Sequence, residues 1–163
     1  MSKKAKGQPG ELQVCRNSKA LARYAIDEKF EAGMVLTGSE VKSLRDKKAD
    51  LDGSYAGLQQ GELMLFKMYI GPYAQATAFG HELKRPRKLL AHRHEIEKLT
   101  GKLALRGYTL VPLSVYFKNG RAKVELGLAK AKDVGDRRED LKREVDLREA
   151  KAAMAATARG RGR

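Results

Sequence analysis

The sequence predicts a mainly β fold, a small antiparallel barrel with flanking helices and a flexible basic C-terminal tail. Two pairs of β-type runs joined by glycine-containing turns, at 54–70 and 109–128, carry the strand signal. Two segments, 39–48 and 89–103, show the three- and four-residue apolar spacing of a helix. After residue 131 the chain becomes highly charged with few apolar anchors, so we expect the barrel to end there.

The first elements are expected in the N-terminal third of the chain. Residues 1–11 hold lysine, glycine, proline and polar residues, which indicates a basic N-terminal arm. The run from Ala22 to Leu36 reads as the first ordered strand, and Gly33 within it indicates a bulge or bend. Ser39 is the expected N-cap of a short helix that continues to Lys48, with Glu40 in its first turn.

The middle of the chain is expected to form a hairpin, a loop and a helix, in that order. Residues 54–58 and 62–70 flank a glycine-containing turn, and the second run is long enough for a central strand. Residues 71–88 contain two prolines and two glycines and are expected to be loop. One helical apolar stripe then follows, made of Leu89, His92, Ile96, Leu99 and Leu103.

The strongest local signal is the hairpin formed by residues 109–117 and 122–128. Asn119-Gly120 between the two runs supplies the two positive φ values that a type I′ turn requires. Pro112 cannot donate a ladder hydrogen bond, which predicts an edge or a bulge there. Five or six strands with two helices in roughly 120 residues suit an oligonucleotide-binding (OB) type barrel, which we place at residues 12–131.

Residues 132–163 are expected to be a charged tail that is disordered alone and helical on a partner. Charges of both signs dominate residues 132–149, whereas the alanine-rich stretch 150–158 favours helix intrinsically. Leu141 and Val145 are among its few apolar residues, which are too few to bury a core of their own.

The composition indicates a protein that binds a polyanion. Among 163 residues, Lys and Arg number 34 and Asp and Glu number 20, so the net charge is +14 and the pI is about 10.0. Nucleic acid is the commonest partner for such a charge. The sequence has no apolar run of membrane-spanning length and no secretory signal, so a cytoplasmic location is expected.

The inventory of reactive residues gives no sign of an enzyme, a cofactor or a metal site. The single cysteine, Cys15, is expected to be a small buried residue. His92 and His94 are separated by one residue, which is not the spacing of a helical metal pair. A metal-dependent nuclease is disfavoured because the paired carboxylates fall in expected loop and tail: Asp50 with Asp52, and Asp133 with Asp136.

Basic residues gather in two clusters, one in the expected loop before the helix at 89–103 and one on and beside the Asn-Gly hairpin. Arginines in such a loop can bind phosphates in bidentate fashion, and four tyrosines are available to stack on bases, which together suit folded RNA. A solvated surface is the alternative for most single lysines. The residues concerned are Lys84, Arg85, Arg87, Lys88 and Arg93; Lys118, Arg121, Lys123, Lys130 and Lys132; and Tyr24, Tyr55, Tyr69 and Tyr73.

Six runs of residues stand in the order and spacing of one known family. They are Asn17-Ser-Lys19-Ala20, Phe30-Glu31-Ala32-Gly33, Gly38-Ser-Glu40-Val41-Lys42-Ser43-Leu44-Arg45, Arg85-Pro-Arg87-Lys88-Leu89-Leu90, Gly107-Tyr-Thr109-Leu-Val111-Pro112-Leu113 and Lys123-Val-Glu125-Leu-Gly127-Leu-Ala129. On these runs the chain resembles the SmpB family, the SsrA-binding proteins that partner bacterial transfer-messenger RNA (tmRNA). The resemblance covers nearly all of residues 15–132.

The resemblance implies an OB-type barrel that binds the tRNA-like end of tmRNA in trans-translation. In that process the protein–RNA complex enters the vacant A site of a stalled ribosome, the nascent chain is tagged for degradation, and the ribosome is released. The implied partners are tmRNA, the ribosome with its rRNA and small-subunit decoding region, and the elongation factor that delivers aminoacylated tmRNA. A structural ribosomal protein is the alternative that composition alone leaves open.

The resemblance also implies a set of RNA-binding residues. Basic members are expected to neutralise phosphates, Asn17 to read a base edge or a 2′-OH, and Leu90 to pack on an unstacked base or in the core. Glu31 is expected to accept hydrogen bonds from a base or orient an arginine; a buried acceptor beside Gly33 is the alternative. Glu40 is expected to serve in helix capping and surface pairing. The full set is Asn17, Lys19, Glu31, Arg85, Arg87, Lys88, Leu90 and Lys123, with Lys130 and Lys132 added from the hairpin cluster.

In the family, the segment after the barrel contacts the decoding region of the small subunit. Here that segment departs from the family pattern at Ala131, where glycine is usual, at Asp133, where lysine is usual, and at Gly135, where a ring is usual. Gly135 cannot make a stacking contact, so that contact is not expected in this chain. The ribosome-binding residues expected in the tail are Asp136, Arg137, Arg138, Lys142 and Arg143.

Overall fold

The structure, a computed structural model, describes residues 11–75, 80–105 and 107–160, and for 134–136 and 158–160 it describes the backbone alone. The chain divides into two units between Ala131 and Lys132. Among the described residues, the first unit contains the strands and three helices, and the second contains one helix. None of the described helices is long and apolar enough to cross a membrane.

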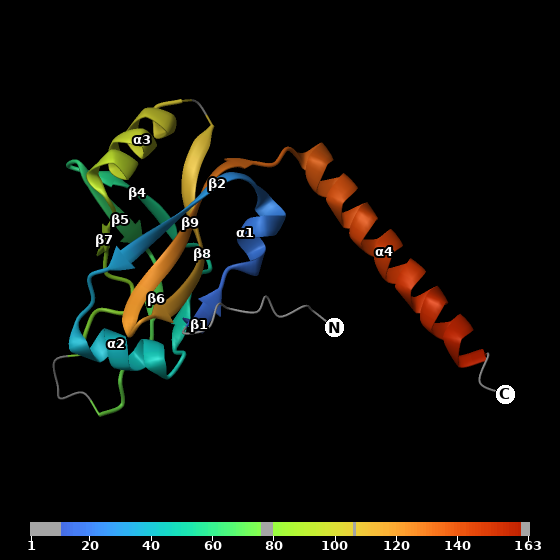
Figure 1. The fold of residues 1–163 in the computed structure, drawn as a ribbon, viewed down its shortest axis with the longest axis horizontal. Coiled ribbons are helices and arrows are strands. Elements are labelled where there is room, and N and C mark those ends of the chain that lie inside the picture. The colour runs from blue at the N-terminus through green and yellow to red at the C-terminus, as the bar shows by residue number, and fades with distance from the viewer. Residues whose placement is uncertain (1–10, 76–79, 106, 161–163) are drawn as a thin grey trace. The chain divides into compact units, whose positions relative to one another are not determined.

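The strands of the first unit close into a ring (Figure 1). Six strands follow one another in the order β8–β4–β5–β7–β2–β9, and β9 pairs in turn with β8. All of these pairings are antiparallel, which confirms the predicted fold class of a mainly β antiparallel barrel. The ring consists of β2 (Tyr24–Met34), β4 (Tyr55–Gln59), β5 (Glu62–Phe66), β7 (Arg87–Leu90), β8 (Tyr108–Lys118) and β9 (Arg121–Ala131).

Aliphatic side chains from alternate strand positions fill the interior of the ring. Leu65 on β5, Leu89 on β7 and Leu126 on β9 are fully buried. The neighbours of Leu65 and Leu89 along their strands are more exposed. Each such leucine contributes about 1.5–3 kcal/mol relative to an exposed one. Three helices pack around the ring and each buries at least one residue: α1 (Ser18–Arg23), α2 (Gly38–Arg45) and α3 (Arg93–Leu103).

The hairpin between β8 and β9 forms as the sequence predicts. Asn119 and Gly120 have φ values of 52° and 75°, so both occupy the left-handed region that a type I′ turn requires. The predicted irregularity at Pro112 is a β-bulge, since the pairing register shifts between Pro112 and Ser114. The bulge does not interrupt β8, and β9 pairs with it on both sides of the bulge, from Tyr108 to Lys118.

The N-terminal elements are richer than predicted, because order begins well before Ala22. β1 (Glu11–Arg16) pairs with the second half of β8, and the six-residue α1 follows it directly. Neither carries a strong pattern, since β1 buries only Val14 among its six residues. The expected N-cap of α2 is also wrong: Thr37 occupies that position, and its N–H and hydroxyl donate to Glu40 Oε1 at 3.2 and 3.0 Å.

Two other boundaries in the middle of the chain differ from the prediction. The expected long strand at 62–70 breaks at Lys67, whose φ is 59°, and continues as β6 (Tyr69–Ile70), which pairs with β3 (Ala49–Asp50). The expected helical stripe from Leu89 is wrong at its start, because Leu89 is an inward position of β7 and α3 begins only at Arg93. Leu89 fits the two-residue period of a strand as well as the three- and four-residue spacing of a helix. The four residues of β7 are too few to distinguish these two periods in the sequence.

In the second unit the described residues form one helix, α4 (Val134–Gly160). This helix comprises most of the tail that we expected to be disordered alone. Ion pairs one turn apart support it, including Arg143 with Glu139 at 3.6 Å and Arg148 with Glu144 at 3.9 Å. Its apolar side chains at Leu141, Val145, Leu147 and Met154 are at least half exposed. The helix therefore depends on alanine propensity and local pairs, and the expected disorder of the tail without a partner stays a prediction.

Candidate RNA interface

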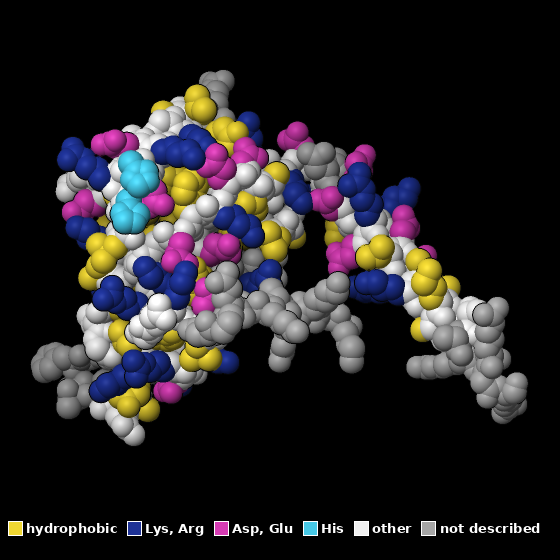
Figure 2. Space-filling model, viewed as in Figure 1, with side chains coloured by type: hydrophobic (Ala, Val, Ile, Leu, Met, Phe, Trp, Pro, Cys, Tyr) yellow, Lys and Arg dark blue, Asp and Glu magenta, His cyan; other side chains and the backbone are white. Residues whose placement is uncertain are grey.

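A groove of about 680 Å³ opens on the barrel surface and gathers three of the predicted RNA-binding residues, Glu31, Leu90 and Lys123. Its walls come from β2, α2, β7, the start of α3 and the β8–β9 hairpin. Figure 2 shows the outer surface of the barrel, where cyan histidines lie beside hydrophobic side chains with Lys and Arg around them. The remaining lining includes Gly33, Met34, Leu36, Val41, Ala91, His92, Glu95, Phe117, Gly120, Arg121 and Ala122.

The strand register places the groove residues in one row. On β2, Gly33 lies opposite Leu90 of β7 on one side and opposite Lys123 of β9 on the other. Lys123 in turn lies opposite Tyr116 of β8. Paired residues project to the same face of a sheet, so this register brings Leu90, Lys123 and Tyr116 to one face from three strands.

Gly33 lies directly beside Leu90 in this row. A Cβ added to it would lie 3.4 Å from the Leu90 Cβ and 3.8 Å from the Leu90 carbonyl oxygen. Leu90 itself is 54% exposed, whereas its neighbour Leu89 is buried, so the core-packing alternative for Leu90 does not hold in this structure. The arrangement presents an exposed leucine side chain next to bare backbone, which suits the flat face of an unstacked base.

Glu31 lies on the same face as Gly33, two residues earlier on β2, and is exposed rather than a buried acceptor. The Tyr116 hydroxyl donates to Glu31 Oε2, and Lys118 Nζ lies 3.5 Å from the same oxygen. The Tyr116 hydrogen bond and the charges of Lys118 and Lys123 hold the pKa of Glu31 below its usual range. Glu31 is therefore a fixed, ionised acceptor at neutral pH.

Tyr116 is a site residue that the sequence reasoning missed. Burial, followed by the bond to Glu31, raises the pKa of Tyr116, so its hydroxyl remains a protonated donor. The composition had instead indicated Tyr24, Tyr55, Tyr69 and Tyr73 as the tyrosines available to stack on bases. The available signal was the hairpin register, which already placed Tyr116 opposite Lys123 once the Asn-Gly turn was assigned.

Asn17 and Lys19 lie away from the groove, in a second pocket of about 320 Å³ that shares none of its lining. The Asn17 side chain accepts from Ala20 N at 3.1 Å as the N-cap of α1 and donates to Pro112 O at 3.0 Å. Its amide thus holds α1 to β8, and its role as a reader of bases stays a prediction. Lys19 is exposed and pairs with Asp52 at 2.5 Å.

The basic run at 85–88 separates into three different environments. Arg87 is fully buried and pairs with Glu40, so its side chain does not reach the surface where a phosphate would bind. Glu40 is fully buried too, which corrects its expected surface pairing. Arg85 is partly exposed and donates to Glu40 Oε1 through Nε at 2.9 Å. Lys88 is exposed and pairs with Glu62 at 2.8 Å, so it is accessible to RNA.

The two lysines at the end of β9 are also engaged. Lys130 Nζ lies 4.4 Å from the centroid of the Tyr108 ring, a cation–π contact on the exposed side of the sheet. Lys132 belongs to the second unit and pairs with Asp140. Both residues remain predictions as RNA contacts.

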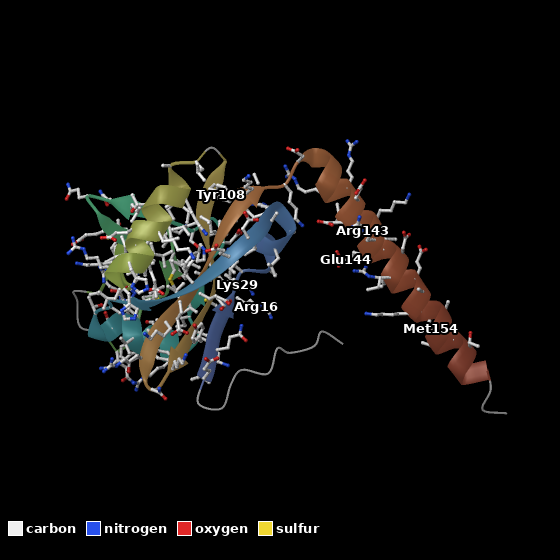
Figure 3. All side chains as sticks on the ribbon, turned by 45° about the horizontal axis from the view of Figure 1, so that its top comes forward. Arg16, Lys29, Tyr108, Arg143, Glu144 and Met154 are labelled. Carbon is white, nitrogen blue, oxygen red and sulfur yellow. The ribbon has the colours of Figure 1, made fainter. Side chains whose placement is uncertain are left out.

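The predicted ribosome-binding residues of the tail lie on α4. Arg137, Arg138 and Lys142 are exposed, as is Arg143, which pairs with Glu139 and lies 3.9 Å from Asp140. Figure 3 shows Arg143, Glu144 and Met154 projecting from this helix. The side chain of Asp136 lies outside the described ones, and Gly135 is described by its backbone alone.

A closed antiparallel barrel with a strongly basic sequence, and a surface groove that combines an apolar side chain, cations and a fixed acceptor, defines an OB-type RNA-binding protein. The family comparison is more specific. The model of the family "SmpB protein" matches residues 14–156, so the chain belongs to the SmpB family.

Individual relatives agree with this assignment. The SsrA-binding protein of Geobacter sulfurreducens is 53% identical over 145 residues, which are 89% of this chain and 95% of that protein. The SsrA-binding protein of Desulforudis audaxviator is 53% identical over 151 residues, 93% of this chain and 96% of that protein. A solved chain described as "tmRNA-SmpB: a journey to the center of the bacterial ribosome" is 47% identical with a TM-score of 0.62, covering 74% of this chain and 85% of that one.

Proposed function

We propose that this protein binds the tRNA-like end of tmRNA in the groove at Glu31, Leu90 and Lys123 and takes it to stalled ribosomes for trans-translation. The observation that carries the proposal is the register row, in which Gly33 brings Leu90 and Lys123 together beside Glu31. Support comes from relatives that are SsrA-binding proteins and from the solved tmRNA–SmpB chain.

Each groove residue has a distinct physical task in this proposal. Leu90 packs against the face of an unstacked base, and the absent side chain at Gly33 leaves room for that base to approach. Lys123 and Arg121 neutralise phosphates on the rim. Glu31, aligned by Tyr116, accepts a hydrogen bond from a base amino group or a 2′-OH, which favours particular RNA groups over phosphate.

The remaining steps of the proposal concern the partners. The complex enters the vacant A site, where α4 contacts rRNA near the decoding region through Arg137, Arg138, Lys142 and Arg143. An elongation factor delivers the aminoacylated tmRNA. The protein supplies recognition and placement, whereas peptidyl transfer is the work of the ribosome, so the chain acts as an RNA-binding protein rather than as an enzyme.

The proposal is tested by the affinity of the full chain for the tRNA-like domain of tmRNA at several salt concentrations. If about five to seven lysines and arginines neutralise phosphates, log K should fall with log salt at a slope of about −4 to −6. Lys123→Ala should cost about 1–3 kcal/mol and reduce the magnitude of the slope by about one. Lys48→Ala is the matched control, because Lys48 is exposed and does not line the groove.

Equal affinities and equal slopes for the wild type, Lys123→Ala and Lys48→Ala would remove the groove from the RNA footprint. A slope near zero in the wild type would remove the electrostatic account altogether, since neutralised phosphates must release counterions.

A further inference from the structure

Arg87 and Glu40 form a charged pair that is entirely buried, although Arg87 lies in one of the most basic stretches of the sequence. Arg87 Nε donates to Glu40 Oε2, its Nη1 donates to Met68 O at 2.6 Å, and its Nη2 donates to Leu83 O at 3.2 Å. The guanidinium therefore joins α2, the bend after β5 and the segment before β7.

Glu40 is equally saturated by donors. Its Oε1 accepts from Thr37 and from Arg85, while Oε2 accepts from Arg87. Burial by itself raises the pKa of a carboxyl group, but the hydrogen bonds from Arg87 and Arg85 and the one from Thr37 N outweigh burial and lower the pKa of Glu40. Glu40 is thus ionised at neutral pH, and without Arg87 it would be a buried charge lacking its closest partner.

Arg87 is also the first residue of β7, the short strand that carries the groove leucine. β7 has four residues, of which Arg87 and Leu89 point inward while Lys88 and Leu90 point outward. Each neighbouring strand holds it by two paired positions, so its ladder is short. A slip of one residue would turn Leu90 inward and leave Glu40 without Arg87.

We propose that Arg87 and Glu40 are positioning residues that fix the register of β7 and so hold Leu90 against Gly33 in the RNA groove. The pair makes the slipped register costly, because a buried carboxylate would lose its counter-charge. This inference rests on the proposed function for the role of Leu90, whereas the register lock itself is a property of the protein without RNA.

The Glu40→Gln variant separates the register lock from a direct contact of Arg87 with phosphate, because the two predict opposite changes in RNA affinity. Glu40→Gln removes a negative charge from an RNA-binding protein, so long-range electrostatics alone would strengthen binding. As part of a register lock, the same change weakens binding, since Arg87 loses the charge that holds it inward. Glu62→Gln is the matched control, because Glu62 pairs with the outward Lys88 on the surface.

The decisive experiment is a rescue. Arg87→Met, Glu40→Gln and the double variant, all in the full chain, are compared for affinity to the tRNA-like domain and for the salt slope. We expect each single variant to bind about tenfold more weakly with an unchanged slope. The double variant should recover to within about threefold of wild type, because an apolar residue at position 87 keeps the inward pattern and no fully buried charge is left unpaired; Arg85, which also loses Glu40, is partly exposed to water.

A double variant that stays as weak as Arg87→Met, with a slope reduced in magnitude by about one, would overturn the proposal and return Arg87 to the RNA contacts. Tighter binding by Glu40→Gln would overturn it as well. If a single variant does not fold, the double variant alone decides, since the two accounts differ in its affinity and in its slope.

A readout without RNA separates this inference from the proposed function. The amide of Val35 donates to Lys88 O at 3.0 Å, so its rate of hydrogen exchange reports whether β7 is paired in its normal register. Exchange should be faster in Arg87→Met and restored in the double variant. If the wild type does not bind the tRNA-like domain, the proposed function fails while this measurement still tests the lock; unchanged exchange in Arg87→Met would refute the lock itself.

Discussion

A chain that stops after Lys132 should bind tmRNA within about tenfold of the full chain, about 1.4 kcal/mol, yet fail to support tagging on stalled ribosomes. All residues of the two buried apolar clusters lie before this position, so the barrel retains its interior. The groove residues also lie before it. The shortened chain lacks α4 with its exposed arginines and lysines. On the ribosome, rRNA phosphates would bind these cations and so favour the ordering of the helix.

Two assays separate the steps: gel shift with tmRNA, and tag addition in a reconstituted translation system on a message without a stop codon. A full-length control with Arg137, Arg138, Lys142 and Arg143 changed to glutamine keeps helix-forming residues and removes only the charge. It should behave like the shortened chain. Normal tagging by the shortened chain contradicts this division of roles, and so does a parallel loss of tmRNA binding and tagging.

Glu40→Ala should lower the free energy of unfolding by about 3–5 kcal/mol, the cost of leaving a buried partner charge uncompensated. Glu62→Ala removes a carboxylate of the same kind from an exposed pair and should cost at most about 1 kcal/mol. Urea unfolding of the two variants measures the difference directly. Equal, small losses in both would mean that the Glu40–Arg87 pair contributes no more than a surface pair.

The same pair predicts how stability depends on pH. The pKa of Glu40 is lowered in the folded protein from an ordinary value of 4.5, so its stabilisation is complete above that value. It is lost as the pH falls through the lower pKa of the folded state. The unfolding free energy of the wild type should therefore fall more steeply below about pH 4.5 than that of the Glu40→Gln/Arg87→Met variant; parallel curves would contradict the assignment.

The sequence was sufficient for the barrel class because its strongest signals are local. Asn119-Gly120 can hardly serve any turn but a tight hairpin, and that turn fixes the pairing of β8 with β9. The groove residues Glu31, Leu90 and Lys123 followed from the family resemblance, and the structure brings them together. The row through Gly33 could not be derived, since it needs the pairing of β2 with both β7 and β9.

Arg87 shows why the rest of the site could not be read from the sequence. Three of the four residues at 85–88 are basic, and basic runs normally face solvent, so all three were expected on the RNA surface. The inward position of Arg87 depends on Glu40, which is 47 residues away in the sequence and paired with it only by the fold. Asn17 is similar, because its partner Pro112 is distant in sequence.

The central claim is that the groove at Leu90 binds tmRNA, and cross-linking in the producing cell tests it most directly. A photoreactive amino acid replaces Leu90 or, as control, Leu12, which is 50% exposed against 54% for Leu90 and does not line the groove. The RNA cross-linked to the purified full chain is then sequenced. We expect one dominant stable RNA with a tRNA-like end from position 90 and little from position 12. A broad mixture of ribosomal RNA fragments, or the same yield from both positions, would contradict the account.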